Sequence, residues 1–414
     1  MEVDDGGNPP RPAIIGAADE ATAYELNTDS RELNPCISLF VTRFLVFAPL
    51  KNERRGACNS PVKVSLRPSL TRAVATAPRL SEISPIVRTP STFSTAVTTS
   101  RAIETGLVVR AFAPGSTGNI GPGLDILGCA LTGPGDAVRA RLTVEPGVRV
   151  DEPGHPDLTR DPNRHASAIA AAEVLRRAGA RVGIVLSVEK GLPLSGGQGG
   201  SAASAVAGAL ATNTLLGSPL DQDELLRAAL VAEERLAGRH IDNLAPALFG
   251  GIVLIRSIDP IDIIRLPVPA NLRVVIVHPQ MLLRTTDARA VLPATIDRAT
   301  AIAQAAAVAT IVAALYSDDL SRLRGAIDDR IAEPARTPLL PGFAAAKAAA
   351  LAAGALGSSI SGGGPSAFAL VDGDTGAAAV MDAMVAAYEA HGVTASGRVA
   401  GVDEVGARIE EVNA

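Results

Sequence analysis

The spacing of hydrophobic and polar residues changes near residue 106. Before that position, apolar residues follow neither the 3.6-residue period of a helix nor the two-residue period of a strand, and Pro, Ser, Thr and Arg are frequent. Such a segment buries too little apolar surface to hold a fold, and its acidic start, Met1-Glu-Val-Asp-Asp, is a poor targeting signal. We therefore predict that residues 1–106 are a disordered or spurious extension without chemistry. A transit-like segment is the alternative.

From residue 107 onward, strand-like and helix-like runs follow one another to the C-terminus. Apolar alternation and short apolar runs predict strands at 107–113, 138–144, 182–188, 251–255, 272–277, 356–361 and 366–371. Helical spacing predicts helices at 164–178, 201–216, 221–237, 295–315, 318–331, 342–353 and 375–391. Asn163 is a candidate N-cap, and Asp221 with Glu224 forms a capping-box-like start. Because these elements do not alternate as regular βαβ units, we predict an α+β fold.

Composition narrows the class of protein. Hydrophobic residues make up 47% of the chain but aromatic residues only 3%, so small aliphatic side chains build the core and helices pack closely. The net charge of −5 argues against a nucleic-acid partner. We expect no apolar run near the roughly 18 residues that span a membrane, and hence no membrane partner. Three sparse cysteines indicate a reducing compartment, the cytoplasm, and their spacing suggests no structural metal.

A glycine-rich stretch, Pro193-Leu-Ser-Gly-Gly-Gln-Gly-Gly-Ser-Ala-Ala-Ser204, joins a predicted strand to a predicted helix. Its four glycines allow close approach of the backbone to a ligand, and the N–H groups and dipole of the following helix favour a phosphate. The stretch has no Lys and is not a Walker A loop, and it lacks the third glycine of the dinucleotide fingerprint. We interpret it as a phosphate-binding loop, with a ligand-free turn as the alternative.

Two more glycine-rich loops, at 114–124 and 362–365, complete what we interpret as a ligand cradle. Together with their neighbours, these loops resemble the GHMP kinase family, and within it most closely the homoserine kinases. The resemblance covers residue 107 to the C-terminus. It is carried by Ala113-Pro-Gly-Ser-Thr-Gly-Asn-Ile-Gly-Pro-Gly-Leu-Asp-Ile-Leu-Gly128, the loop at 193–204, His240-Ile-Asp-Asn-Leu-Ala-Pro-Ala-Leu-Phe-Gly-Gly251, residues 284–293, Glu333-Pro-Ala-Arg336 and Ser359-Ile-Ser-Gly-Gly-Gly-Pro-Ser366.

The resemblance implies a fold, an activity and partners. The fold is the GHMP kinase fold, with a ribosomal-S5-like ATP-binding domain at 107–265 and a ferredoxin-like domain at 266–414. The activity is ATP-dependent phosphorylation of the side-chain hydroxyl of L-homoserine to O-phospho-L-homoserine, in threonine biosynthesis. The implied cofactors are ATP and Mg²⁺, and the implied assembly is a homodimer.

The resemblance also assigns the nucleotide and metal residues. Ser201 and Glu233 resemble the family's Mg²⁺-handling hydroxyl and carboxylate, and oxygen ligands suit this ion. Glu234 is the competing carboxylate. The ATP phosphates are expected at Pro193, Leu194, Ser195, Gly196, Gly197, Gln198, Gly199, Gly200, Ser201, Ala202 and Ala203.

Homoserine is a zwitterion, so its site needs groups of both charges. Arg289 and Arg336 resemble the family's carboxylate ligands, since a guanidinium can hold a carboxylate with two parallel hydrogen bonds. The amino-side and hydroxyl-side contacts are expected at Asn119, Asp125, His240 and Asp242.

Two residues of this set are expected to act at the reacting atoms. Asp242 is our candidate for the hydrogen bond to the attacking hydroxyl, as a base or as an orienting group. Thr285 is a candidate contact of the hydroxyl or the γ-phosphate. Ordinary surface arginines and a structural histidine are the alternative interpretations of the charged members.

The phosphate loop departs from the family's usual pattern. The family has Gly and Ser where this chain has Ser195 and Gly196, Leu in place of Gln198, and Ser in place of Gly200. One hydroxyl is therefore missing beside the expected metal, and an extra glycine makes the loop more flexible. A sibling small-molecule kinase and a non-catalytic nucleotide-binding protein are the alternative functions.

Overall fold

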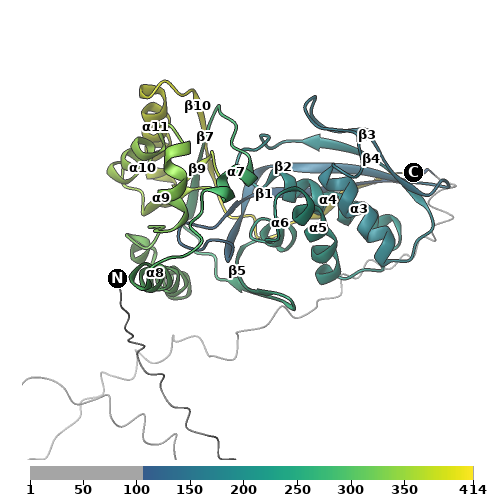
Figure 1. Cartoon of the computed structure of the whole chain (residues 1–414), viewed down its shortest axis with the longest axis horizontal. Helices are drawn as coiled ribbons and strands as arrows, with labels where there is room; N and C mark the ends of the chain where they lie inside the picture. The colour runs from purple at the N-terminus through teal and green to yellow at the C-terminus, as the bar shows by residue number, and fades with distance from the viewer. Residues whose placement is uncertain (1–105, 414) are drawn as a thin grey trace, which may run out of the picture. The chain divides into compact units, whose positions relative to one another are not determined.

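The computed structural model describes residues 106–413, so the predicted extension at 1–106 lies almost wholly outside the described residues (Figure 1). Residues 106–413 form a seven-stranded sheet and a four-stranded sheet. The first sheet has the order β11-β1-β2-β4-β3, with β5 paired to β2 and β6 paired to β5, and the second has the order β10-β7-β9-β8. Each sheet is accompanied by helices, as expected for the predicted α+β class.

The strands of the first sheet are β1 (Val108–Gly118), β2 (Leu127–Thr143), β3 (Gly147–Glu152), β4 (Gly183–Lys190), β5 (Ile252–Ile258), β6 (Ile261–Leu266) and β11 (Arg408–Asn413). One face of this sheet is covered by α3 (Ala166–Arg177), α4 (Gly200–Leu215), α5 (Gln222–Leu236) and α6 (Leu244–Phe249), seen together in Figure 1. Alanine-rich α4 packs directly on β1 and β2 and is buried along most of its length. Its small side chains let the helix approach the sheet closely, so the core is packed without many aromatic residues.

The second sheet consists of β7 (Leu272–Pro279), β8 (Gly357–Ile360), β9 (Ala367–Asp372) and β10 (Ala395–Ala400). Its helical elements are α7 (Thr285–Ala290), α8 (Arg298–Ser317), η3 (Leu320–Leu323), α9 (Ala332–Arg336), η4 (Thr337–Leu339), α10 (Phe343–Ala352) and α11 (Asp374–Ala390).

Strand β7 is buried on both faces. Val275 and Val277 belong to the core that α10 and α11 form, whereas Val274 and Ile276 belong to the core that contains α8. This division follows from the two-residue period of a strand. The α8 core also includes Leu127 from β2 of the first sheet. The two sheets are therefore joined by a shared hydrophobic core, which fixes the loops between them.

The chain returns to its first sheet at the end. Strand β11 pairs antiparallel with β1, and Val108 lies opposite Asn413. The domain boundaries 107–265 and 266–414 stay a prediction, but the last strand of the second segment lies in the first sheet.

The structure corrects three details of the sequence analysis. The helix predicted at 318–331 is only a short 3-10 turn, Leu320–Leu323, because Asp318 ends α8 in the left-handed conformation and Gly325 also has a positive φ. Helix α3 begins after His165 and not after Asn163. We expected no apolar run long enough to span a membrane, and this was wrong, because α8 is both long enough and apolar enough. Such a helix also occurs in proteins that cross no membrane.

Candidate active site

A cavity of about 960 Å³ opens between the two sheets, lined by loops from both. Among the expected site residues, Asn119, Ser201, Glu233, His240, Asp242, Thr285, Arg289 and Arg336 line it. It is also lined by Pro193, Leu194, Ser195, Gly196, Gly197, Gly199, Gly200 and Ala202 of the glycine-rich stretch. Asp125 is absent from the lining but contacts Arg289. The three glycine-rich loops and the charged residues thus meet around one cavity.

The glycine-rich loop at 193–200 connects β4 to α4 in a strained conformation. Ser195, Gly197 and Gly199 have positive φ values of 50°, 71° and 69°. A Cβ on Gly199 would lie 2.2 Å from Ser116 Oγ, and one on Gly197 would lie 2.5 Å from the Ser361 carbonyl oxygen. Only glycine fits these two positions, so the glycines allow the loop to pass close to β1 and to the residues after β8.

Two residues of the stretch 193–203, Gln198 in the loop and Ala203 in the first turn of α4, do not line the cavity. Gln198 is buried and donates a hydrogen bond from Nε2 to Ser366 Oγ (3.3 Å), while its Oε1 accepts one from Arg398 Nη2 (3.3 Å). Ala203 is fully buried in the core between the first sheet and its helices. The side chain of Gln198 thus ties the loop to Ser366 and Arg398.

A buried ion pair braces the base of the loop, and sequence reasoning missed it. Lys190 donates to Asp136, to the Gly200 carbonyl oxygen (3.1 Å) and to Ser204 Oγ (3.1 Å). Ser204 Oγ donates to Asp136 Oδ2 (2.6 Å), and the Asp136 carboxylate also accepts the N–H groups of Gly191 and Leu192. All three ammonium hydrogens of Lys190 are used, so it acts as a brace of the loop. The one local signal was a lysine at the end of the strand before the loop.

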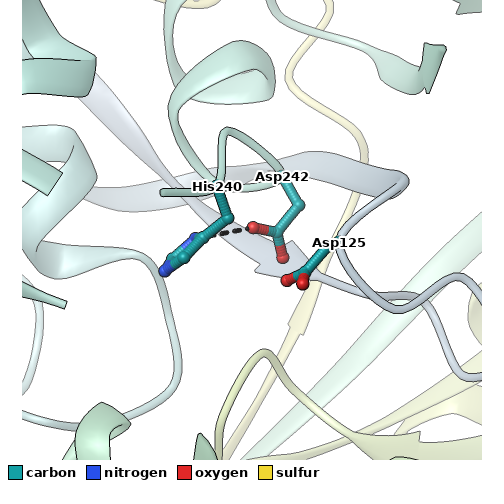
Figure 2. Close-up of side chains that lie close together, drawn as sticks. All are labelled: Asp125, His240 and Asp242. Atoms are coloured by element: carbon teal, nitrogen blue, oxygen red, sulfur yellow. Dashed lines mark hydrogen bonds and ion pairs between the residues drawn. The ribbon is translucent and has the colours of Figure 1, made fainter. Parts of the chain in front are cut away.

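Glu233, His240 and Asp242 form a buried chain beside Ser201. His240 Nδ1 lies 3.0 Å from Asp242 Oδ1, and its Nε2 lies 3.5 Å from Glu233 Oε1. Figure 2 shows the His240 ring directed at the Asp242 carboxylate, with Asp125 beside it. Of the two candidate carboxylates, Glu233 lines the cavity, whereas Glu234 is exposed and pairs with Arg239.

The pKa values of Glu233 and His240 are shifted by burial and by neighbouring charges. Burial raises the pKa of Glu233, opposed by His240. Burial alone would lower the pKa of His240, but the hydrogen bond and charge of Asp242 and the charge of Glu233 raise it above the ordinary value. Within residues 106–413, Glu233 Oε2 and His240 Nε2 are buried without a hydrogen-bond partner. Buried polar atoms are normally paired, so this part of the site fits a polar ligand.

Asp125 and Arg289 bring the two charges of the site together. Arg289 donates from Nη2 to Asp125 Oδ1 (2.5 Å) and from Nη1 to Asp125 Oδ2 (3.2 Å). Asn119 Oδ1 accepts the Asp125 N–H (3.0 Å), and its Nδ2 donates to the Gly362 carbonyl oxygen (2.8 Å). Ligand atoms of Asp125, His240 and Asp242 lie within 4.8 Å of one another (Figure 2).

Arg336 lines the same cavity as Arg289, close enough for the two charges to interact. Its Nε donates to the Ala288 carbonyl oxygen (2.9 Å) and its Nη1 to that of Gly362 (3.1 Å). It is only 2% exposed, and burial lowers its pKa. In the part of the chain that the structure describes, no carboxylate pairs with Arg336, so its charge is available to an anion.

Two family models match the chain: "GHMP kinases N terminal domain" over residues 166–251 and "GHMP kinases C terminal" over residues 311–390. A homoserine kinase from Arabidopsis thaliana is 39% identical over 313 residues, covering 73% of this chain and 84% of the relative. One from Chlorobaculum tepidum is 41% identical over 295 residues, covering 68% and 90%.

Solved structures give the same result. The crystal structure of homoserine kinase from Cytophaga hutchinsonii is 40% identical, with a TM-score of 0.70, and the match covers 73% of this chain and 97% of that one. The chain belongs to the GHMP kinase family, which confirms the predicted fold and the resemblance. Within that family, the relatives cited above at about 40% identity are homoserine kinases.

Proposed function

We propose that this chain phosphorylates the side-chain hydroxyl of L-homoserine with ATP, forming O-phospho-L-homoserine and ADP in threonine biosynthesis. The names of its relatives support this function. The observation that carries it is the Asp125–Arg289 pair beside the cavity that the phosphate loop lines. A carboxylate and a guanidinium side by side match the ammonium and carboxylate groups of an amino acid.

GHMP kinases use ATP as the phosphate donor, and the loop at 193–203 suits its phosphates. We place Mg²⁺ at Ser201 and Glu233, since the buried Glu233 Oε2 has no hydrogen-bond partner among residues 106–413. When bound, this ion would neutralise phosphate charge. The hydroxyl missing at Gly200 leaves Ser201 as the hydroxyl at the helix start.

In the proposed arrangement, Arg289 and Arg336 hold the substrate carboxylate, and Asn119, Asp125 and His240 lie on the ammonium side. Asp242 accepts the hydrogen bond of the attacking hydroxyl, and Thr285 contacts the hydroxyl or the γ-phosphate. The hydroxyl oxygen bonds to the γ-phosphorus as the bond between that phosphorus and the β–γ bridging oxygen breaks, and the hydroxyl proton is released. Because an alcohol is far more basic than a carboxylate, we assign orientation of the hydroxyl as the main role of Asp242.

ADP release with a panel of alcohols tests the function. Purified protein with Mg²⁺ and ATP is expected to release ADP with L-homoserine and not with galactose or mevalonate. Turnover with mevalonate alone would assign a sibling kinase, since mevalonate also carries a carboxylate. ATP binding by calorimetry without ADP release from any member would support the non-catalytic alternative, which the loop departures favour.

We also propose a homodimer in the cytoplasm. Helix α8 supports the dimer because no charged residue lies between Arg298 and Asp318, while Ile302 is 63% and Tyr316 47% exposed. A helix without charges usually packs against another surface. Light scattering during size-exclusion chromatography checks this, with Ala306→Arg on the exposed face expected to give a monomer.

A further inference from the structure

Gln304 is a buried, uncharged polar side chain on α8, and it is not among the expected site residues. It is 7% exposed on a helix whose other buried residues are Ile311, Ala314 and Leu315. A buried amide is costly unless its donors and acceptor are all paired. Its position therefore calls for an explanation in terms of the groups that pair with it.

Every kind of hydrogen-bonding group on the Gln304 amide is used. Nε2 donates to the Pro122 carbonyl oxygen (2.9 Å) and to Asp329 Oδ1 (2.9 Å). Oε1 accepts the N–H of Arg330 (3.0 Å). One side chain of α8 thus holds the loop that follows β1 and the segment that precedes α9.

The loop held on one side carries the ammonium-side residues. Pro122 lies between Asn119 and Asp125, which are joined by the hydrogen bond from the Asp125 N–H to Asn119 Oδ1. Both residues have positive φ values, 71° and 61°. A non-glycine residue in that conformation persists only where its surroundings hold it, and the Pro122 contact is one such support.

The segment held on the other side positions Arg336. Asp329 accepts the N–H groups of Ile331, Ala332 and Glu333 at 2.9 to 3.1 Å, and so caps the start of α9. Helix α9 has five residues and ends at Arg336. So short a helix has little stability of its own, so its placement depends on contacts at its start.

We propose that Gln304 is a positioning residue that sets the separation between the ammonium side of the substrate site, Asn119 and Asp125, and the carboxylate ligand Arg336. The inference rests on the proposed function, because it assumes that these residues bind the two ends of one amino acid. Gln304 touches neither the substrate nor the nucleotide in this scheme. Its effect is therefore expected on the grip of the substrate carboxylate and not on ATP.

The test compares L-homoserine with 3-amino-1-propanol, the same amino alcohol without its carboxylate. In Gln304→Met, which keeps the length of the side chain but removes its hydrogen bonds, kcat/KM for homoserine is expected to fall at least about tenfold. The value for 3-amino-1-propanol should stay within about twofold, because it needs only the ammonium side, where Asn119 keeps its hydrogen bonds with Asp125 and Gly362 without Gln304. The KM for ATP should also stay within about twofold. Thr310→Ala, on the same helix, removes an exposed hydroxyl that donates to the Ala306 carbonyl oxygen (2.8 Å) and should change nothing.

Asp329→Asn provides a second variant, since it keeps the shape of the cap but places an amide N–H₂ against the backbone donors. It should reproduce the selective loss for homoserine. An equal loss for both alcohols, no loss, or failure of both variants to fold would overturn the positioning role. Arg336→Ala separates the two levels of the proposal: if it leaves kcat/KM for homoserine intact, the proposed substrate site is wrong, whereas a loss there without one in Gln304→Met rejects only the role of Gln304.

Discussion

Arg289 and Asp125 form a two-point ion pair across the two halves of the chain, with Nη2 2.5 Å from Oδ1 and Nη1 3.2 Å from Oδ2. Asp125 lies in the loop before β2 of the first sheet, and Arg289 lies on α7, which follows β7 of the second. Each partner carries the charge opposite to that of one end of an amino acid. A bound zwitterion can therefore replace this pair with two pairs of its own, without leaving either side chain unpaired.

The first prediction concerns the geometry of Arg289. Arg289→Lys keeps the positive charge but loses the planar fork that binds a carboxylate at two points. We expect the apparent KM for homoserine to rise about tenfold or more, with the KM for ATP unchanged, in steady-state assays of ADP release. Arg298→Lys, an exposed arginine at the start of α8, is the control. An unchanged homoserine KM in Arg289→Lys would remove Arg289 from the substrate site.

The second prediction separates two adjacent carboxylates. Glu233→Gln removes the charge of the buried side chain that lines the cavity, so the Mg²⁺ concentration for half-maximal activity should rise at least about tenfold. Glu234→Gln, its exposed neighbour that pairs with Arg239, should leave that concentration unchanged. The measurement is a Mg²⁺ titration at saturating ATP and homoserine. Equal effects of the two substitutions would argue against a metal role for Glu233.

The third prediction concerns the phosphate loop. Gly199→Ala places a Cβ 2.2 Å from Ser116 Oγ at a residue with positive φ, so the loop must move. Gly200→Ala meets no atom closer than 3.3 Å, the distance to Lys190 Nζ, and Gly200 starts α4 with an ordinary φ. We expect ATP affinity, measured by calorimetry, to fall about tenfold or more in the first variant and little in the second. Similar affinities would show that this turn does not shape the nucleotide site.

The fourth prediction concerns Cys129. Burial raises the pKa of its thiol to about 12, so at pH 8 on the order of one molecule in ten thousand carries the reactive thiolate. In a Cys36→Ser, Cys58→Ser background, Ellman's reagent at pH 8 should find no thiol in the folded protein and one after denaturation. Because the folded protein holds this proton more tightly, the contribution of Cys129 to stability is lost as pH rises above the ordinary thiol value. Rapid labelling of the folded protein would contradict its burial.

The sequence could predict those parts of the site that depend on local pattern. The strand, the glycines and the helix around 193–204 are neighbours in the chain, and their order alone indicates a phosphate loop. The brace beneath it was beyond reach, because Lys190 and Asp136 are 54 residues apart and meet only when β2 and β4 pair. The helix predicted at 318–331 failed because Asp318 and Gly325 adopt positive φ values that apolar spacing does not reveal.

The assignment of roles within the loop shows a further limit. Gln198 is expected to meet the phosphates through its backbone, and its side chain turns to Ser366 and Arg398. Sequence order gives the path of the backbone but not which side of the loop each side chain takes. That choice depends on the second sheet, which begins more than seventy residues later.

The pairing of β11 with β1 has a practical meaning for anyone who shortens or extends this protein. Removing β11 would leave β1, the strand that leads to Asn119 and Asp125, without its partner on one side. The backbone N–H and C=O groups on that side of β1 would then be unpaired. Strand β11 is therefore part of the scaffold behind the pocket, and an affinity tag belongs after this strand, with a spacer, and never in its place.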